Sequence, residues 1–164
     1  AVLLLARALA AHSDEVPPDF RDCRPAPVQA GELQASPPPP RLDTRQAKRY
    51  ATELREAAKS PADFAGHFKL ATWGCGAGCV MAAAINTRSG RVVFLPFTVS
   101  DWPLSVQEPL SYRQDSCLLK VQGRRNEAQQ GVYFYRFDGG EFRAGTIATI
   151  DRNRGVNTGL GCLV

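Results

Sequence analysis

The sequence has few of the residues that common catalytic and binding motifs require. Of its 164 residues, two are histidines and one is methionine. No Gly-Lys-Ser/Thr follows its glycine-rich stretch, which excludes a P-loop, and no two acidic residues have a spacing suited to paired acid–base chemistry. Lysine is scarce and arginine is scattered, so the net charge of +4 does not indicate a nucleic-acid partner.

The sequence also lacks an apolar run of about 20 residues, which is the length that a transmembrane helix needs. The first ten residues are mostly apolar but too short to cross a bilayer. They are typical of the end of a signal-peptide apolar region, and Ala8-Leu9-Ala10 has the small-x-small pattern that signal peptidase cleaves. We therefore interpret residues 1–13 as a signal-peptide remnant and expect a periplasmic or secreted protein without a transmembrane segment.

The sequence has five cysteines, and in an exported chain they are expected to form disulfide bonds. Four are candidates for structural disulfides: Cys75, Cys79, Cys117 and Cys162. The favoured pairing joins Cys75 to Cys79 across a glycine loop and Cys117 to Cys162, while the crossed pairings of these four stay open. Cys23 lies in a proline-rich segment and is the candidate for an unpaired thiol.

Proline is concentrated in residues 14–42, where it removes backbone donors and favours extended geometry. We expect this segment to be a disordered tether with little core of its own. A helix is predicted from Asp43, which can cap the first turn, to Lys59, before Ser60-Pro61. Apolar residues recur there at three- and four-residue steps, so the helix is amphipathic and should pack on a sheet.

Most of the remaining sequence indicates β-strands. Alternating or continuous apolar residues predict strands at 67–73, 80–85, 91–97, 117–121, 132–137 and 141–150. Asp138-Gly139-Gly140 is a strong hairpin signal, whereas nearby prolines predict a loop at 98–111. Residues 43–164 are therefore predicted to form a single disulfide-stapled α+β domain, with an antiparallel sheet of about five to six strands and one main amphipathic helix.

The residues that could carry chemistry gather between Phe64 and Cys79, in F-A-G-H-F-K-L-A-T-W-G-C-G-A-G-C. His67 could deprotonate Cys75 or Cys79 to give a catalytic thiolate, or the three could ligate Cu(I) or Zn(II). The glycines could also form an anion-binding nest. However, no third catalytic residue and no fourth metal ligand is visible, and an oxidising compartment favours a disulfide. We therefore favour a structural role for this loop.

The pattern F-A-G-H-F followed by T-W-G-C-G-x-G-C resembles the motif F-A-G-H-[FY]…W-G-C-G-x-G-C of a family of small exported Gram-negative bacterial proteins of unassigned function. The resemblance extends through Leu95-Pro96-Phe97 and the hairpin at 131–142. It implies an exported location and a similar fold, and it brings no activity with it.

Together these observations favour a non-enzymatic protein, an exported and periplasmic binding or inhibitor-type module. Its expected partner is a protein or an envelope component, and no nucleic acid, cofactor or resident metal is expected. The binding candidates are His67, Trp73 and Trp102, and the expected contact surface is the 98–111 loop beside Cys75–Cys79. The alternative is a thiol- or metal-dependent activity centred on His67, Cys75 and Cys79. The sequence leaves the oligomeric state open.

Overall fold

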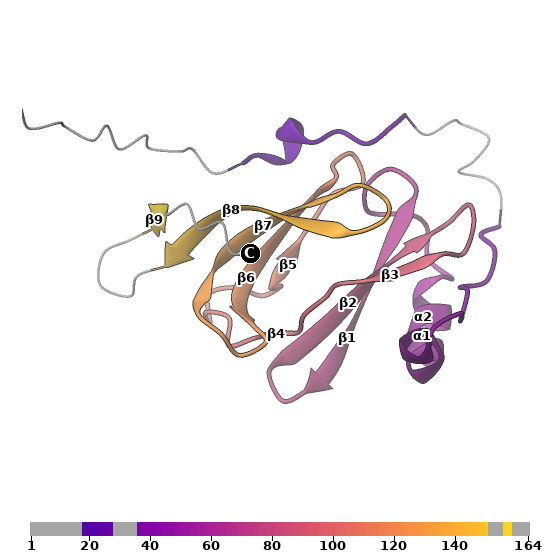
Figure 1. The fold of residues 1–164 in the computed structure, drawn as a ribbon, viewed down its shortest axis with the longest axis horizontal. Helices are drawn as coiled ribbons and strands as arrows, with labels where there is room; N and C mark the ends of the chain where they lie inside the picture. The colour runs from indigo at the N-terminus through magenta and orange to yellow at the C-terminus, as the bar shows by residue number, and fades with distance from the viewer. Residues whose placement is uncertain (1–17, 28–35, 151–155, 159–164) are drawn as a thin grey trace, which may run out of the picture.

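One antiparallel β-sheet dominates the architecture of the chain. The computed structural model describes residues 18–27, 36–150 and 156–158, arranged as Figure 1 shows. Within these residues nine strands join one sheet in the order β1-β2-β4-β6-β7-β8-β9, with β3 paired to β2 and β5 paired to β6. The strands are β1 (Phe68–Gly76), β2 (Cys79–Asn86), β3 (Val92–Phe94), β4 (Val99–Ser100), β5 (Leu110–Ser111), β6 (Leu118–Arg125), β7 (Gln130–Phe137), β8 (Phe142–Ile150) and β9 (Val156–Thr158).

The predicted α+β class, with five to six strands and one main helix, is therefore wrong, because the fold is mainly β. Strands β4 and β5 lie in the segment predicted to be a loop, and β9 lies in the C-terminal tail. Each has only two or three residues, which is too short for an alternating pattern to be recognised. Such strands form because a longer neighbour offers backbone N–H and C=O groups that need partners.

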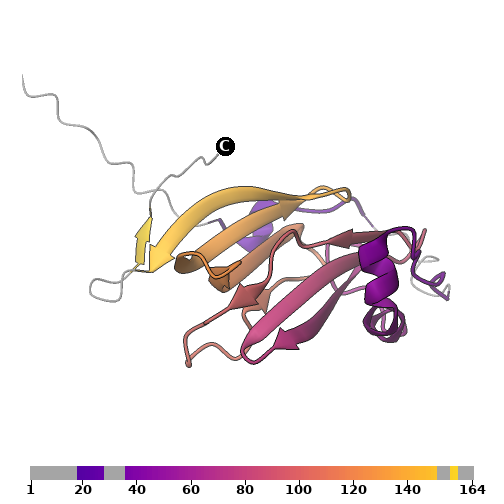
Figure 2. The ribbon, with the colours of Figure 1, turned by 60° about the horizontal axis from the view of Figure 1, so that its bottom comes forward.

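The sheet curls so that distant strands share one core. In the strand order β1 and β7 are separated by β2, β4 and β6, yet the rings of Phe68 and Phe137 lie 4.8 Å apart. Phe64 is fully buried, and its ring lies 5.3 Å from Phe137 and 6.2 Å from Phe142. Figure 2 shows β7 and β8 as a layer above the β1–β2 hairpin. The main core fills the inside of this curl.

Two short helices take the place of the single helix predicted at 43–59. They are α1 (Arg45–Arg49) and α2 (Ala51–Ala57), separated where Tyr50 leaves helical geometry with φ −106° and ψ 30°. The first turn is capped by Thr44, whose hydroxyl accepts a hydrogen bond from the Ala47 N–H at 3.0 Å, and not by the predicted Asp43. In the described parts of the chain, neither helix has the length and apolar character needed to span a membrane.

The helices cover the face of the β1–β2 hairpin opposite the main core. Leu54 of α2 is fully buried and belongs to a second apolar cluster with Ala71 and Ala83. Alternate strand residues, such as Leu70 and Ala82, point into the main core. The alanines let the helix come close to the sheet, as the run of small residues in β2 predicts.

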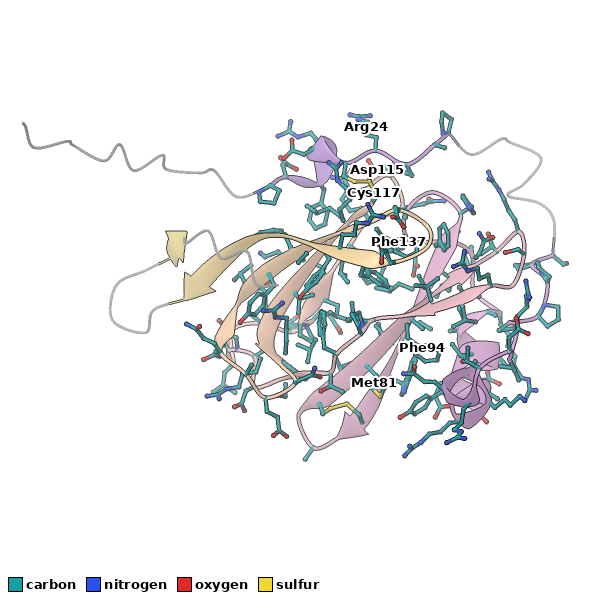
Figure 3. The ribbon with its side chains drawn as sticks, in the orientation of Figure 1. Arg24, Met81, Phe94, Asp115, Cys117 and Phe137 are labelled. Carbon is teal, nitrogen blue, oxygen red and sulfur yellow. A yellow bond between two sulfur atoms is a disulfide. The ribbon has the colours of Figure 1, made fainter. Side chains whose placement is uncertain are left out.

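A disulfide bond between Cys23 and Cys117 attaches the N-terminal strap, residues 18–27, to the sheet. The Cys117 N–H also donates to the Cys23 carbonyl at 2.9 Å, beside a 3-10 helix, η1 (Phe20–Asp22). Figure 3 shows Cys117 below the strap. Two predictions are thereby corrected: Cys23 is not the unpaired thiol, and Cys117 is not bonded to Cys162, which lies outside the described residues. Cys23 is buried in the core, with an exposed fraction of 5%. Its position beside Cys117 in the fold therefore decides its partner, although the two cysteines are far apart in the sequence.

Another described stretch of the predicted tether, residues 36–42, also contacts the sheet. The Arg41 N–H donates to the Gly90 carbonyl at 2.7 Å, and Pro40 is buried. Parts of the proline-rich segment are therefore ordered on the domain. The predicted signal-peptide remnant at 1–13 lies outside the described residues.

Candidate functional site

The tip of the β1–β2 hairpin, residues 74–79, holds the predicted disulfide bond between Cys75 and Cys79. Strand pairing is regular up to Gly74 and then shifts, so that Gly76 pairs with Cys79. Gly78 turns the chain with φ +62°, a conformation that L side chains rarely adopt. The bond closes a small ring with a Cα–Cα distance of 5.1 Å, which restricts the tip to a narrow range of conformations.

The segment after β4 leaves the sheet beside this tip. Cys79 pairs with Ser100, so Asp101 follows next to the disulfide. The Asp101 carbonyl accepts a hydrogen bond from Gln130 Nε2 at 2.7 Å, and its carboxylate pairs with Arg124 Nε at 3.0 Å. Contacts to β6 and β7 therefore anchor the base of the loop.

A surface hollow of about 650 Å³, here called the tip hollow, lies between the tip and this loop. Its lining residues are Ala77, Gly78, Ser100, Asp101, Trp102, Leu104, Arg124 and Glu127. Trp102 is half-buried and packs against the main core. Leu104 is fully exposed, and among the described side chains no other large hydrophobic one is exposed. The tip hollow thus combines two large apolar side chains with charges of both signs.

Trp73, another binding candidate, is engaged within the fold. Its ring lies 5.1 Å from the ring of Tyr50 and 6.1 Å from that of Phe94, in edge contact with the latter. It belongs to the cluster between the helices and the hairpin. Its half-buried ring therefore seals the edge of that cluster and does not line the tip hollow.

His67 lies at the other end of the hairpin, directly before β1. Its Nε2 is 3.4 Å from Asn86 Nδ2. Its carbonyl accepts hydrogen bonds from the N–H and the hydroxyl of Thr87 at 3.0 and 2.7 Å. The half-buried imidazole lies 4.6 Å from the ring of Phe68 and lines a second hollow, of about 930 Å³. The contacts with Thr87 fix the backbone of His67, and those with Asn86 and Phe68 position its ring.

The structure therefore does not assemble the alternative thiol or metal site. An extended strand rises about 3.3 Å per residue, so His67 and Cys75 are roughly 26 Å apart along β1. Cys75 and Cys79 are bonded to each other. Across residues 18–27, 36–150 and 156–158, no group of three or more His, Cys, Asp or Glu side chains could hold a metal. Residues that are close in sequence are separated here because the chain between them is a strand.

A partly buried polar cluster near His67 was not predicted. Asp63 Oδ1 accepts a hydrogen bond from the Leu70 N–H at 2.9 Å, and its Oδ2 pairs with Lys69 and lies 3.5 Å from the Tyr112 hydroxyl. Burial, reinforced by the Asp63 charge, raises the pKa of Tyr112 to about 12. No sequence signal connects Tyr112 to Asp63, because the segments that carry them meet only in the fold. These contacts satisfy the hydrogen-bonding capacity of the Asp63 carboxylate and hold the start of β1 in place.

Comparisons with known proteins give no identity. No protein-family model, no curated protein and no solved structure matches the chain. The family resemblance carried by the F-A-G-H-F and W-G-C-G-A-G-C motifs therefore stays a prediction.

Proposed function

We propose that the chain is an exported, periplasmic binding or inhibitor-type module that contacts a protein or an envelope component through the tip hollow. The observation that carries this proposal is the tip hollow itself, in which a disulfide-closed turn faces Trp102 and Leu104. Aromatic side chains dominate the energy of protein contacts, and loops on a rigid scaffold are the usual place for them.

The loop that carries Trp102 and Leu104 is anchored at both ends. Before it, Val99 pairs with Arg125, and after it Leu110 pairs with Val121, so both ends join β6. A loop held in one conformation before binding loses less conformational entropy on contact with its partner. This preorganisation is what an inhibitor-type module requires.

The export part of the proposal rests on the cysteines and on the signal-like sequence. Two disulfide bonds are present among the described residues, and such bonds persist mainly in oxidising compartments. This is compatible with an extracellular or periplasmic protein. The small-x-small pattern within residues 1–13 and the resemblance to exported Gram-negative proteins favour the periplasm. Thiol-alkylation mass spectrometry on periplasmic material tests this, because Cys75 and Cys79 should not react before reduction.

Site-specific photocrosslinking tests the contact surface. A photoreactive amino acid replaces Leu104 in the full chain, expressed in the cells that make the protein, and the matched control carries it at Arg55, an exposed residue of α2. We expect one defined adduct at position 104 and none at position 55. Excess purified wild-type protein should suppress the adduct, and the same excess of a Trp102→Ala variant should not. Equal labelling from both positions, or equal competition by both proteins, would contradict the proposal.

A further inference from the structure

The second hollow, here called the strap hollow, lies between the N-terminal strap and the β7–β8 turn. It has a volume of about 930 Å³. Phe68 and Phe137, which are 4% and 3% exposed, form its apolar floor together with the Cys23–Cys117 disulfide. Figure 3 shows Cys117 and Phe137 below the strap that carries Arg24. The tip hollow is at the far end of the same hairpin, so the two hollows are separate.

Cationic and amide side chains form the rim of the strap hollow. Arg91 and Arg136 line it together with Asn86 and His67. Arg91 Nη2 lies beside the β7–β8 turn, 3.9 Å from where a Cβ on Gly140 would be. Arg136 Nη2 donates to the Asp22 carbonyl of the strap at 3.3 Å. The guanidinium groups of Arg91, which directly precedes β3, and of Arg136 in β7 therefore border one opening, which Arg24 of the strap also lines.

The carboxylates that also line the strap hollow are engaged elsewhere. Asp138 Oδ1 accepts hydrogen bonds from the backbone N–H groups of Gly140 and Glu141 at 2.8 and 3.0 Å, and its Oδ2 pairs with Arg143 at 3.1 Å. These hydrogen bonds lower the pKa of Asp138, so it stays ionised within its own turn. Asp22 Oδ2 accepts from the Asp19 N–H at 2.6 Å.

Arg91 and Arg136 are therefore not neutralised by the acids nearest to them. In the part of the chain that the structure describes, neither takes part in an ion pair. On the neighbouring strand, Arg143 is opposite Arg136 and holds both Asp138 and Glu141. The rim thus presents positive charge and N–H donors over an apolar floor.

The geometry points to a binding site in the strap hollow for a small organic carboxylate with an apolar body. Guanidinium groups form short, charge-assisted hydrogen bonds with carboxylates, often in pairs. The rings of Phe68 and Phe137 offer apolar contact to the remainder of such a ligand, in the way of small-molecule sites with apolar walls and a few polar groups. This site is independent of the surface proposed for partner binding.

Ligand-observed fluorine NMR on the full, oxidised chain tests this site, with 4-fluorophenylacetate as the probe. The neutral 4-fluorophenylacetamide serves as the charge control, and inorganic phosphate serves as the control for the apolar body. We expect the carboxylate to bind at least tenfold more tightly than either control. Amide chemical shift changes should centre on His67, Asn86 and Gly139.

Two variants that lose the same charge test whether probe binding depends on the strap hollow. The double variant Arg91→Gln/Arg136→Gln should bind the probe at least tenfold more weakly than wild type. The variant Arg45→Gln/Arg55→Gln removes the same charge from the exposed helix residues and should change the affinity less than twofold. Circular dichroism confirms that both variants are folded. Absence of probe binding to wild type, equal binding of the amide or phosphate, or equal loss in the two variants would overturn the proposal.

Discussion

The two disulfide bonds should contribute very differently to stability, because they close loops of very different length. Cys23 and Cys117 are 94 residues apart, whereas Cys75 and Cys79 are 4 apart. A cross-link removes loop-closure entropy from the unfolded chain, and the amount grows with the logarithm of loop length. For these separations the chain-entropy relation gives about 4.7 and about 2 kcal/mol at 25 °C. The strap bond is therefore expected to be the main staple.

Paired alanine substitutions measure this difference. Alanine is chosen because Cys23 and Cys117 are 5% and 9% exposed, and a serine hydroxyl would be buried there without a designed partner. The variants are Cys23→Ala/Cys117→Ala and Cys75→Ala/Cys79→Ala, each in the full chain with Cys162 retained. Urea denaturation followed by circular dichroism gives the free energy of unfolding of each.

We expect the strap variant to be less stable than the tip variant by about 2 to 3 kcal/mol, the difference between the two loop-closure terms. Burial of the strap sulfurs in the main core adds to this difference, because alanine leaves part of their volume empty. Equal losses in the two variants, or a larger loss from the tip, would refute the reasoning. Such a result would mean that the strap bond contributes little beyond the contacts that hold the strap without it.

Three further predictions concern the close packing of the fold. Gly90→Ala should destabilise the protein by more than about 1 kcal/mol in urea unfolding, because φ is +73° and a Cβ would lie 2.3 Å from the Pro39 carbonyl oxygen. Phe64→Ala should lower the free energy of unfolding by about 3–5 kcal/mol in the same assay, because the ring is fully buried between the strands that the curled sheet brings together. The pKa of Tyr112 is raised from 10 to about 12, so the folded state holds the phenol proton more tightly than the unfolded state. The stability that this contributes is complete below pH 10 and is lost as the pH rises through about 12. Tyr112→Phe should lack that loss, and the late step in tyrosinate absorbance should shrink by the contribution of one tyrosine, because burial also raises the pKa of Tyr135.

Local sequence patterns predicted most of the long strands of the sheet, but they did not predict how the sheet curls. The alternation in β7 and the Asp138-Gly139-Gly140 turn correctly indicated the β7–β8 hairpin. The apolar stripe of the helical segment correctly indicated that it packs on the sheet, where its cluster contains Ala71 of β1 and Ala83 of β2. The fold class was wrong because β4 and β5 are set by their pairing to β2 and β6 and not by a pattern of their own.

Part of the candidate site could likewise be predicted from local sequence, while the rest depended on the tertiary structure. The link from Cys75 to Cys79 spans a single turn, so spacing and glycine content were enough to favour it. The nearness of the tip to the 98–111 segment was expected, while the exposure of Leu104 and the anchoring by Arg124 came from the structure. The grouping of His67 with the two cysteines failed because an extended strand separates them.

By itself, the sequence determined the features that depend on residues close to one another along the chain. These are the hairpin turns, the strand alternation, the amphipathic helical segment and the tip disulfide. Only the tertiary structure decided that Cys23 bonds with Cys117 and that Arg136 reaches the strap. It also decided that Phe64 packs on β7 and β8. These contacts depend on how far the sheet curls. That curl is set by the summed pairing of all its strands and by the filling of one shared core, which no short stretch of sequence specifies.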